Sequence, residues 1–121
     1  MQKRILIVDD SKTMRDMLLV TLTQAGFDVV QAEDGQAALS KLDTATVDVI
    51  ITDINMPVMD GITFIKECRA NAAFASTPIL TLTTESSDAK KAEGRAAGAT
   101  GWIVKPFKPE SLVRVIEKVS P

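Results

Sequence analysis

The stretch ILIVDD, residues 5–10, is the part of the sequence that best indicates the fold. Four apolar residues run together without polar alternation, which is typical of a strand covered on both faces, as in a parallel sheet. The run ends at Asp9 and Asp10. The stretch therefore predicts a short buried strand whose carboxyl end bears two carboxylates.

Further apolar runs share this character. They are VV at residues 29–30, VDVII at 47–51, ILTL at 79–82 and WIV at 102–104. Segments with helical spacing of apolar residues follow the runs, and Ser11, either Ser86 or Ser87, and Pro109 suit helix starts. Strands alternating with helices and joined by right-handed crossovers predict an α/β protein with a doubly wound sheet in three layers.

Length and composition restrict the class of protein. A chain of 121 residues, 45% hydrophobic and 25% charged, predicts one globular domain over residues 1–121. Histidine is absent and Cys68 is the single cysteine, which excludes Cys/His zinc sites, His-based triads and internal disulfides. The net charge of -2 lacks the basic excess that nucleic-acid binding needs. With no signal peptide or membrane span, we expect a cytoplasmic protein with no membrane partner.

Ligands bind beyond the carboxyl ends of strands in an open parallel sheet. Those ends carry Asp9, Asp10, Asp53, Thr83 and Lys105. Carboxylates ~5 Å apart at an effective dielectric constant of ~20 repel by about 3 kcal/mol per pair, so cations must balance them. Lys105 neutralises one charge, and an all-oxygen ligand set favours Mg²⁺ or Mn²⁺ over zinc.

Asp53 is equipped for a second task. A carboxylate beside a metal ion, a hydroxyl and a lysine can attack a phosphoryl group and form an aspartyl phosphate. Positioning and charge neutralisation would supply most of the catalysis. The plain alternative is that the Asp and Thr residues at the strand ends only cap helices and turns.

Several motifs resemble those of the receiver domains of two-component response regulators. They are VDDS at residues 8–11, DINMPVMDG at 53–61, TTE at 83–85, and the segment from GA at 98–99 through Trp102 to KPF at 105–107. The similarity covers essentially the whole chain, whose length resembles the single-domain chemotaxis regulators of the CheY type. It implies the flavodoxin-like (βα)5 fold with strand order 2-1-3-4-5.

The resemblance also implies a stand-alone response regulator in chemotaxis or motility. Asp53 would accept a phosphoryl group from a phosphohistidine of a CheA-type histidine kinase or its phosphotransfer domain. Asp9, Asp10 and Asp53 would hold Mg²⁺, with the backbone carbonyl of Asn55 as a further ligand, and Mn²⁺ can substitute.

Thr83 and Lys105 would, by the same resemblance, contact the phosphoryl oxygens, and the Lys105–Pro106 bond is expected to be cis. Trp102 stands where the family has Tyr or Phe, an aromatic that turns inward when Thr83 moves. Its bulkier indole has an N–H to satisfy. Thr84 replaces a smaller residue of the family.

The partner-binding face implied by the resemblance comprises the fourth helix, fifth strand and fifth helix, with Trp102, Lys90, Lys91 and Arg95. A flagellar motor switch protein is the expected partner of a monomeric regulator; a phosphate sink and a type IV pilus output stay open. A solvated charged surface is the plain alternative for the lysines. Gly94 in the fourth helix leaves two interpretations open, a loosely held helix that repacks or close packing without mobility.

Two other functions compete with this one. A phosphatase with an aspartyl nucleophile, of the haloacid-dehalogenase type, needs a second Asp two residues after the first, where Asn55 stands. A flavodoxin-like nucleotide binder needs a phosphate loop after the first strand, where Asp9 and Asp10 stand. We therefore expect a signalling protein that catalyses its own phosphotransfer and autodephosphorylation, and no other enzyme activity.

Single side chains carry smaller expectations. Cys68 and the stripe containing Met14 and Met17 are expected in the core. Arg15 and Asp16 are expected to face solvent, where a docking partner can reach them. Lys108 replaces the family's Ser or Thr and predicts a weaker cap for the last helix.

Overall fold

The computed structural model describes residues 2–121 and alternates strands with helices. The strands are β1 (Arg4–Val8), β2 (Asp28–Ala32), β3 (Val49–Thr52), β4 (Ile79–Thr83) and β5 (Gly101–Val104). The helices are α1 (Lys12–Gln24), α2 (Gly35–Leu42), α3 (Gly61–Ala70), α4 (Asp88–Ala97) and α5 (Pro109–Val119), with a short 3₁₀ helix, η1 (Ala72–Phe74), before β4.

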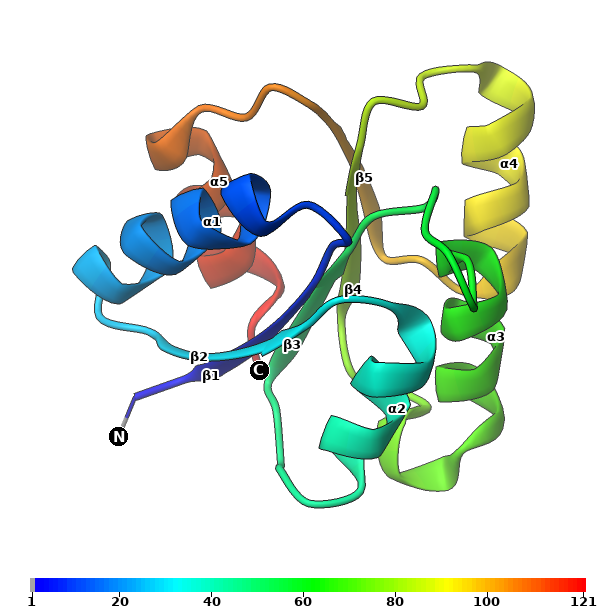
Figure 1. The fold of residues 1–121 in the computed structure, drawn as a ribbon, viewed down its shortest axis with the longest axis horizontal. Coiled ribbons are helices and arrows are strands. Elements are labelled where there is room, and N and C mark those ends of the chain that lie inside the picture. Colours follow the sequence, from blue (N-terminus) through cyan, green and yellow to red (C-terminus); the bar gives the residue numbers. More distant parts are fainter. Residues whose placement is uncertain (1) are drawn as a thin grey trace.

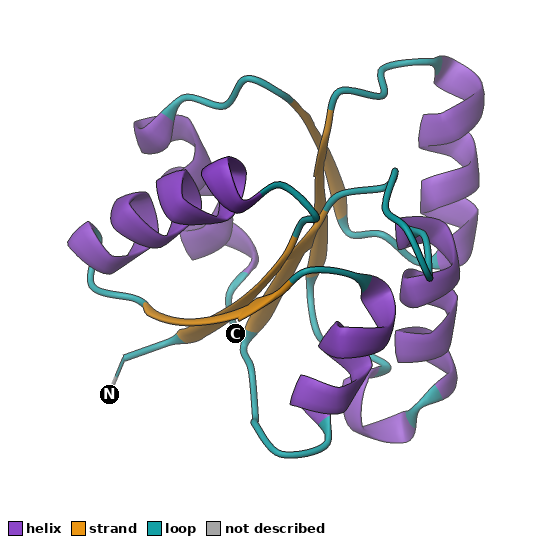
Figure 2. Cartoon of the chain, in the orientation of Figure 1, coloured by secondary structure: helices purple, strands orange, loops and turns teal. Residues whose placement is uncertain are grey.

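All neighbouring strands pair in parallel, in the order β2-β1-β3-β4-β5. Helices α1 and α5 cover one face of the sheet, and α2, α3 and α4 cover the other (Figure 1). Figure 2 shows the strands as a twisted layer between the two helical layers. The predicted fold class and strand order are confirmed.

The core forms on both faces of the sheet. Successive side chains of a strand point to opposite faces, so Ile5 and Ile7 of β1 pack with α1 and α5, while Leu6 and Val8 pack with α2 and α3. All four are essentially inaccessible to solvent. This two-sided burial explains the unbroken apolar run in the sequence.

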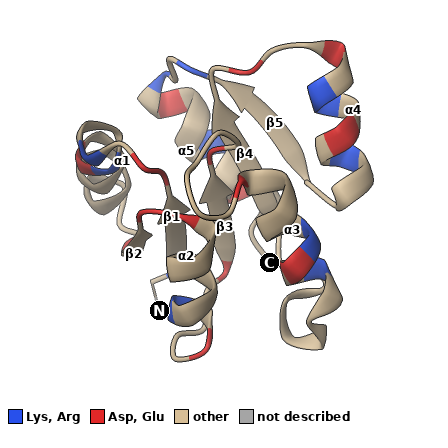
Figure 3. Cartoon of the chain, turned by 45° about the vertical axis from the view of Figure 1, so that its right-hand side comes forward, with Lys and Arg blue, Asp and Glu red and all other residues tan. Residues whose placement is uncertain are grey.

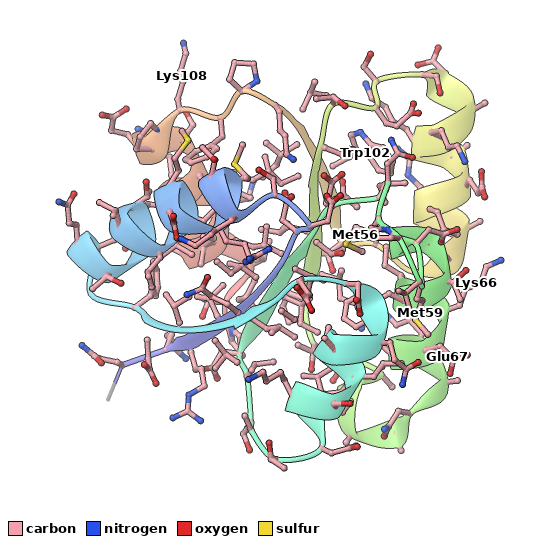
Figure 4. All side chains as sticks on the ribbon, in the orientation of Figure 1. Met56, Met59, Lys66, Glu67, Trp102 and Lys108 are labelled. Carbon is pink, nitrogen blue, oxygen red and sulfur yellow. The ribbon has the colours of Figure 1, made fainter. Side chains whose placement is uncertain are left out.

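The helix caps agree with the sequence. Ser11 accepts a hydrogen bond from the backbone N–H of Met14 at the start of α1. Ser87 rather than Ser86 caps α4, accepting from the N–H of Lys90. Lys108 precedes α5 without a side-chain cap, and its side chain points away from the molecule (Figure 4).

The core prediction for Met17 is wrong, whereas that for Cys68 is confirmed. Cys68 is fully buried in α3. Met17 is 51% exposed, because α1 contacts the sheet along a narrow line through Leu18 and Leu22, and Met17 lies outside it. Among residues 2–121, no helix combines the length and apolar character that crossing a membrane requires.

Candidate functional site

The carboxyl ends of β1 and β3 bring two aspartates side by side. The register pairs Val8 with Thr52, so Asp9 and Asp53 are the next residues of two adjacent strands. The N–H of Asp53 donates to the carbonyl of Val8 at 2.9 Å and extends the ladder by one hydrogen bond. The strand ends therefore place both carboxylates at one edge of the sheet.

Asp9, Asp10 and Asp53 form a compact acidic cluster, in which one carboxylate oxygen of each lies within 4.8 Å of the others. Asp9 and Asp53 are buried, with exposed fractions of 2% and 8%, while Asp10 is exposed. The set offers only oxygen ligands, which suits a hard divalent cation. The open side of the cluster is at Asp10, the carboxylate that solvent reaches.

Lys105 spans two members of this cluster. Its Nζ lies 2.8 Å from Oδ2 of Asp9 and 2.8 Å from Oδ2 of Asp53. Burial lowers the pKa of the Lys105 ammonium. The hydrogen bonds to Asp53 and Asp9, together with the charges of these carboxylates, raise that pKa by more than burial lowers it, so the pKa lies above its ordinary value. The Lys105 ammonium contacts two of the three carboxylates, so the cluster keeps an excess of negative charge.

The loop after Asp53 is tightly constrained. Oδ1 of Asp53 accepts a hydrogen bond from the N–H of Ile54 at 2.6 Å. Gly61, at the start of α3, passes so close that a Cβ there would lie 2.2 Å from the carbonyl oxygen of Asp53. Between them, Val58 adopts a φ of 69°, a conformation that β-branched residues rarely adopt. Asn55 lies in this loop and is exposed.

A chain of hydrogen bonds runs from Thr83 to Trp102 through the backbone of Glu85. Thr83 ends β4 at the same edge of the sheet and is fully buried. Its Oγ1 accepts from the N–H of Glu85 at 3.2 Å, and the carbonyl of Glu85 accepts from Nε1 of Trp102 at 2.9 Å. The indole N–H therefore has a hydrogen-bond acceptor.

The peptide bond between Lys105 and Pro106 is cis, as expected.

Trp102 joins β5 to α4, and its side chain is drawn on the α4 side of the sheet in Figure 4. Together with Lys91 and Arg95 it lines a small hollow of about 100 Å³. Lys90 lies outside this hollow and pairs with Glu93 at 3.5 Å. Figure 3 shows basic and acidic segments alternating along α4. We call the hollow and its lining residues the α4–β5 surface.

Arg15 departs from the expectation that it faces solvent. It is partly buried, and its Nη1 donates to the backbone carbonyl of Asp9 at 2.7 Å. Asp16 is exposed as expected and pairs with Lys12. The sequence signal for Arg15 was available: a long side chain in the first turns of a helix leans toward the strand that precedes it.

Comparison with known proteins identifies the family. The family model described as "Response regulator receiver domain" matches residues 5–117. The chain belongs to the response regulator receiver domain family. The family prediction made from the motifs is confirmed.

Relatives match this receiver over nearly their whole length. The chemotaxis protein CheY1 of Helicobacter pylori (strain ATCC 700392 / 26695) is 42% identical over 118 residues, 96% of this chain and 95% of the relative. The solved structure of Vibrio cholerae chemotaxis protein CheY4 superimposes with a TM-score of 0.94 at 50% identity, covering 98% of this chain and 99% of that one. A putative response regulator from Chloroflexus aurantiacus gives a TM-score of 0.94 at 34% identity, with 98% of each chain covered.

Proposed function

We propose that this receiver accepts a phosphoryl group on Asp53 and thereby controls a partner-binding surface, as a stand-alone regulator of chemotaxis or motility. The observation that carries the proposal is the contact of one buried carboxylate, Asp53, with both an acidic cluster and the Lys105 ammonium. Of the three carboxylates, Asp53 follows the central strand β3 and is flanked by β1 and β4.

The transfer is a displacement at phosphorus. An oxygen of Asp53 attacks the phosphorus of a phosphohistidine on the donor, the new P–O bond forms as the P–N bond breaks, and the imidazole leaves and takes up a proton. The Lys105 ammonium would bind an oxygen of the transferred group, a role that its distance of 2.8 Å from Oδ2 of Asp53 supports. Thr83 ends the neighbouring strand β4, and its hydroxyl would supply a second polar contact to that group.

A divalent cation, for which we propose Mg²⁺ with Mn²⁺ as a substitute, fits the all-oxygen set of Asp9, Asp10 and Asp53. The backbone carbonyl of Asn55 is the further ligand implied by the resemblance. When bound, the ion would neutralise charge that develops on the phosphoryl oxygens. Asp9 and Asp10 would orient the ion, and Lys105 neutralises only part of the negative charge of the cluster.

We propose that phosphorylation at Asp53 changes the α4–β5 surface, where a partner would bind. Phosphorylation that draws the Thr83 hydroxyl toward Asp53 breaks its contact with the Glu85 N–H, and Glu85 also holds the indole of Trp102. A change at Asp53 is thereby linked to the residues beside Lys91 and Arg95. Lys90 lies next to this surface.

The similarity to chemotaxis proteins supports a proposal for the partners. We propose a CheA-type histidine kinase or its phosphotransfer domain as the donor and a flagellar motor switch protein as the receptor, in the cytoplasm, with the receiver as a monomer. A phosphate sink and a type IV pilus output are the alternatives. We propose a signalling role and no turnover of diffusible substrates, since Asn55 replaces the acid that a phosphatase of the haloacid-dehalogenase type needs.

Intact mass after incubation with Mg²⁺ and acetyl phosphate tests the proposal, with Trp102 fluorescence followed in parallel. Wild type should gain the mass of one phosphoryl group while Asp53→Asn gains none, and the emission should change only in wild type. A phosphoryl group on both proteins, or on neither even with a CheA-type kinase, would exclude Asp53 as the acceptor.

A further inference from the structure

Arg15 ties the first helix back to the strand that precedes it. It is the fourth residue of α1, and helical side chains lean toward the N-terminus, so its guanidinium reaches over the turn between β1 and α1. The result is the 2.7 Å hydrogen bond from Nη1 to the carbonyl oxygen of Asp9. Figure 1 shows how directly α1 begins beside the carboxyl end of β1.

Every polar group of Asp9 is bonded, and Arg15 accounts for the last of them. The N–H of Asp9 donates to the carbonyl of Ala32, Oδ1 accepts from the N–H of Ser11, and Oδ2 contacts Lys105. The strand pairing of β1 ends at Val8, and no backbone N–H within residues 2–121 donates to the carbonyl of Asp9. Arg15 therefore fixes the plane of the peptide group between Asp9 and Asp10.

We propose that Arg15 is a positioning residue for the divalent-cation site and acts through the Asp9–Asp10 peptide. This role rests on the proposed function insofar as the site takes up a metal ion. Mg²⁺ demands nearly ideal octahedral geometry, and the two carboxylates beside this peptide are candidate ligands. Removal of a partner that orients metal ligands weakens affinity by roughly 10–100-fold.

The direction in which Mg²⁺ affinity changes when Arg15 is replaced distinguishes a positioning role from a purely electrostatic one. If Arg15 acted only as a nearby positive charge, it would repel a divalent cation, and its loss would tighten binding. If it orients the ligands, its loss weakens binding although a positive charge is removed. Lys12 offers a matched control, because it is a cation of the same helix whose exposed side chain pairs with Asp16.

Isothermal titration with Mg²⁺ alone, at fixed ionic strength, compares wild type with Arg15→Met, Arg15→Lys and Lys12→Met. We expect Arg15→Met to bind Mg²⁺ about ten-fold more weakly, Arg15→Lys to recover part of the loss through its remaining donor, and Lys12→Met to bind at least as tightly as wild type. Circular dichroism and urea unfolding without metal confirm that each variant is folded. Should Arg15→Met not fold, Arg15→Gln replaces it with the same expected sign.

An Arg15→Met protein that is folded and binds Mg²⁺ as tightly as wild type, or more tightly, overturns the positioning role and leaves the phosphoacceptor proposal intact. Equal weakening by Arg15→Met and Lys12→Met overturns it as well. Weaker binding by Arg15→Met in a protein that acetyl phosphate does not modify supports the positioning role and rejects the phosphoacceptor proposal. Absence of Mg²⁺ binding by wild type rejects the metal site and Arg15's role together.

Discussion

Trp102 and Gly94 are complementary in shape, since the indole ring fills the space that a side chain at position 94 would need. A Cβ on Gly94 would lie 2.5 Å from Cζ3 and 3.0 Å from Cε3 of Trp102. A glycine inside helix α4 and a tryptophan in β5 are therefore two halves of one packing arrangement. It supplies a structural reason for a residue that weakens the helix.

We expect Gly94→Ala to lower the free energy of unfolding by about 1 kcal/mol. Overpacking costs about 1–3 kcal/mol and outweighs a gain of about 1 kcal/mol in helix propensity. In a Trp102→Val background the clash is absent, so the same substitution should raise stability by about 1 kcal/mol. Urea unfolding measures both changes.

The control for this cycle is Ala92→Gly, on the exposed side of α4. It should cost about 1 kcal/mol in both backgrounds, because it reports helix propensity alone. The same sign for Gly94→Ala with and without the indole would contradict the complementarity.

In metal-free buffer, Asp53→Asn should melt at a higher temperature than wild type. It removes one of the three clustered carboxylates and leaves Lys105 to Asp9. Mg²⁺ should then raise the melting temperature of wild type more than that of the variant, because binding stabilises the folded state by mass action. Differential scanning calorimetry checks both.

Glu67→Gln is the control for a lost negative charge, since Glu67 is exposed on α3 and points away from the sheet (Figure 4). Glu67→Gln should change the melting temperature neither in metal-free buffer nor with Mg²⁺. Equal midpoints for wild type and Asp53→Asn without metal would show that Lys105 alone balances the cluster.

Val58→Gly should stabilise the receiver by about 1 kcal/mol. The φ of 69° at Val58 costs an L-residue about 1–2 kcal/mol, and glycine adopts it freely at a smaller entropic cost. The side chain is 81% exposed, so its loss forfeits little packing. Val58→Ala keeps the Cβ and should gain much less; urea midpoints that place both variants level would refute strain at this position.

The Cys68 thiol should resist modification and make stability fall at alkaline pH. Burial raises its pKa from 9.0 to about 11, against a smaller lowering by the charge of Arg69. Because the pKa is higher in the folded than in the unfolded state, the protonated thiol contributes its full stability below pH 9. This contribution, about 2 kcal/mol, is lost as the pH rises toward 11.

Urea unfolding between pH 8 and 11 measures that loss, and Cys68→Ala should lack it. Thiol labelling at pH 8 should proceed only as fast as the protein opens, because Cys68 is fully buried. Rapid labelling of the folded protein would be inconsistent with this account.

Helix α4 should exchange its amide protons faster than the other helices. It buries only Gly94 and Ala97, whereas α3 buries five residues. Its C-terminal end is held by Arg69, whose Nε donates to the carbonyl of Gly98 at 3.0 Å, so exchange should be fastest toward Asp88. Hydrogen exchange read by mass spectrometry tests this, and protection of residues 87–97 equal to that of α3 would reject a mobile helix.

Features that depend on a single strand could be predicted from the sequence. The apolar run of β1 and the positions of Asp9, Asp53 and Lys105 follow from burial on two faces and from strands that end together. Strand β2 was predicted from two residues yet spans five, because it is an edge strand whose partly exposed residues lack an apolar signature.

Features that depend on contacts between elements could not be predicted in this way. The fit of Trp102 against Gly94 joins β5 to α4. The lean of Arg15 toward β1 can be predicted from its place in α1, but its acceptor, the carbonyl of Asp9, depends on how α1 crosses the sheet. Met17 lies close to the buried stripe of α1 in sequence, and only the narrowness of the helix contact decides its exposure.

Lys105 is far in sequence from its two ion-pair partners, and this separation has a consequence for synthesis of the protein. Its partners Asp9 and Asp53 precede it by 96 and 52 residues. A nascent chain that has left the ribosome only through β4 carries the carboxylates without their internal counter-ion, and its sheet lacks an edge strand. The acidic edge of the sheet thus gains its internal counter-ion only with the residue that follows the last strand, so a half-made chain lacks both ion pairs that Lys105 forms in the finished receiver.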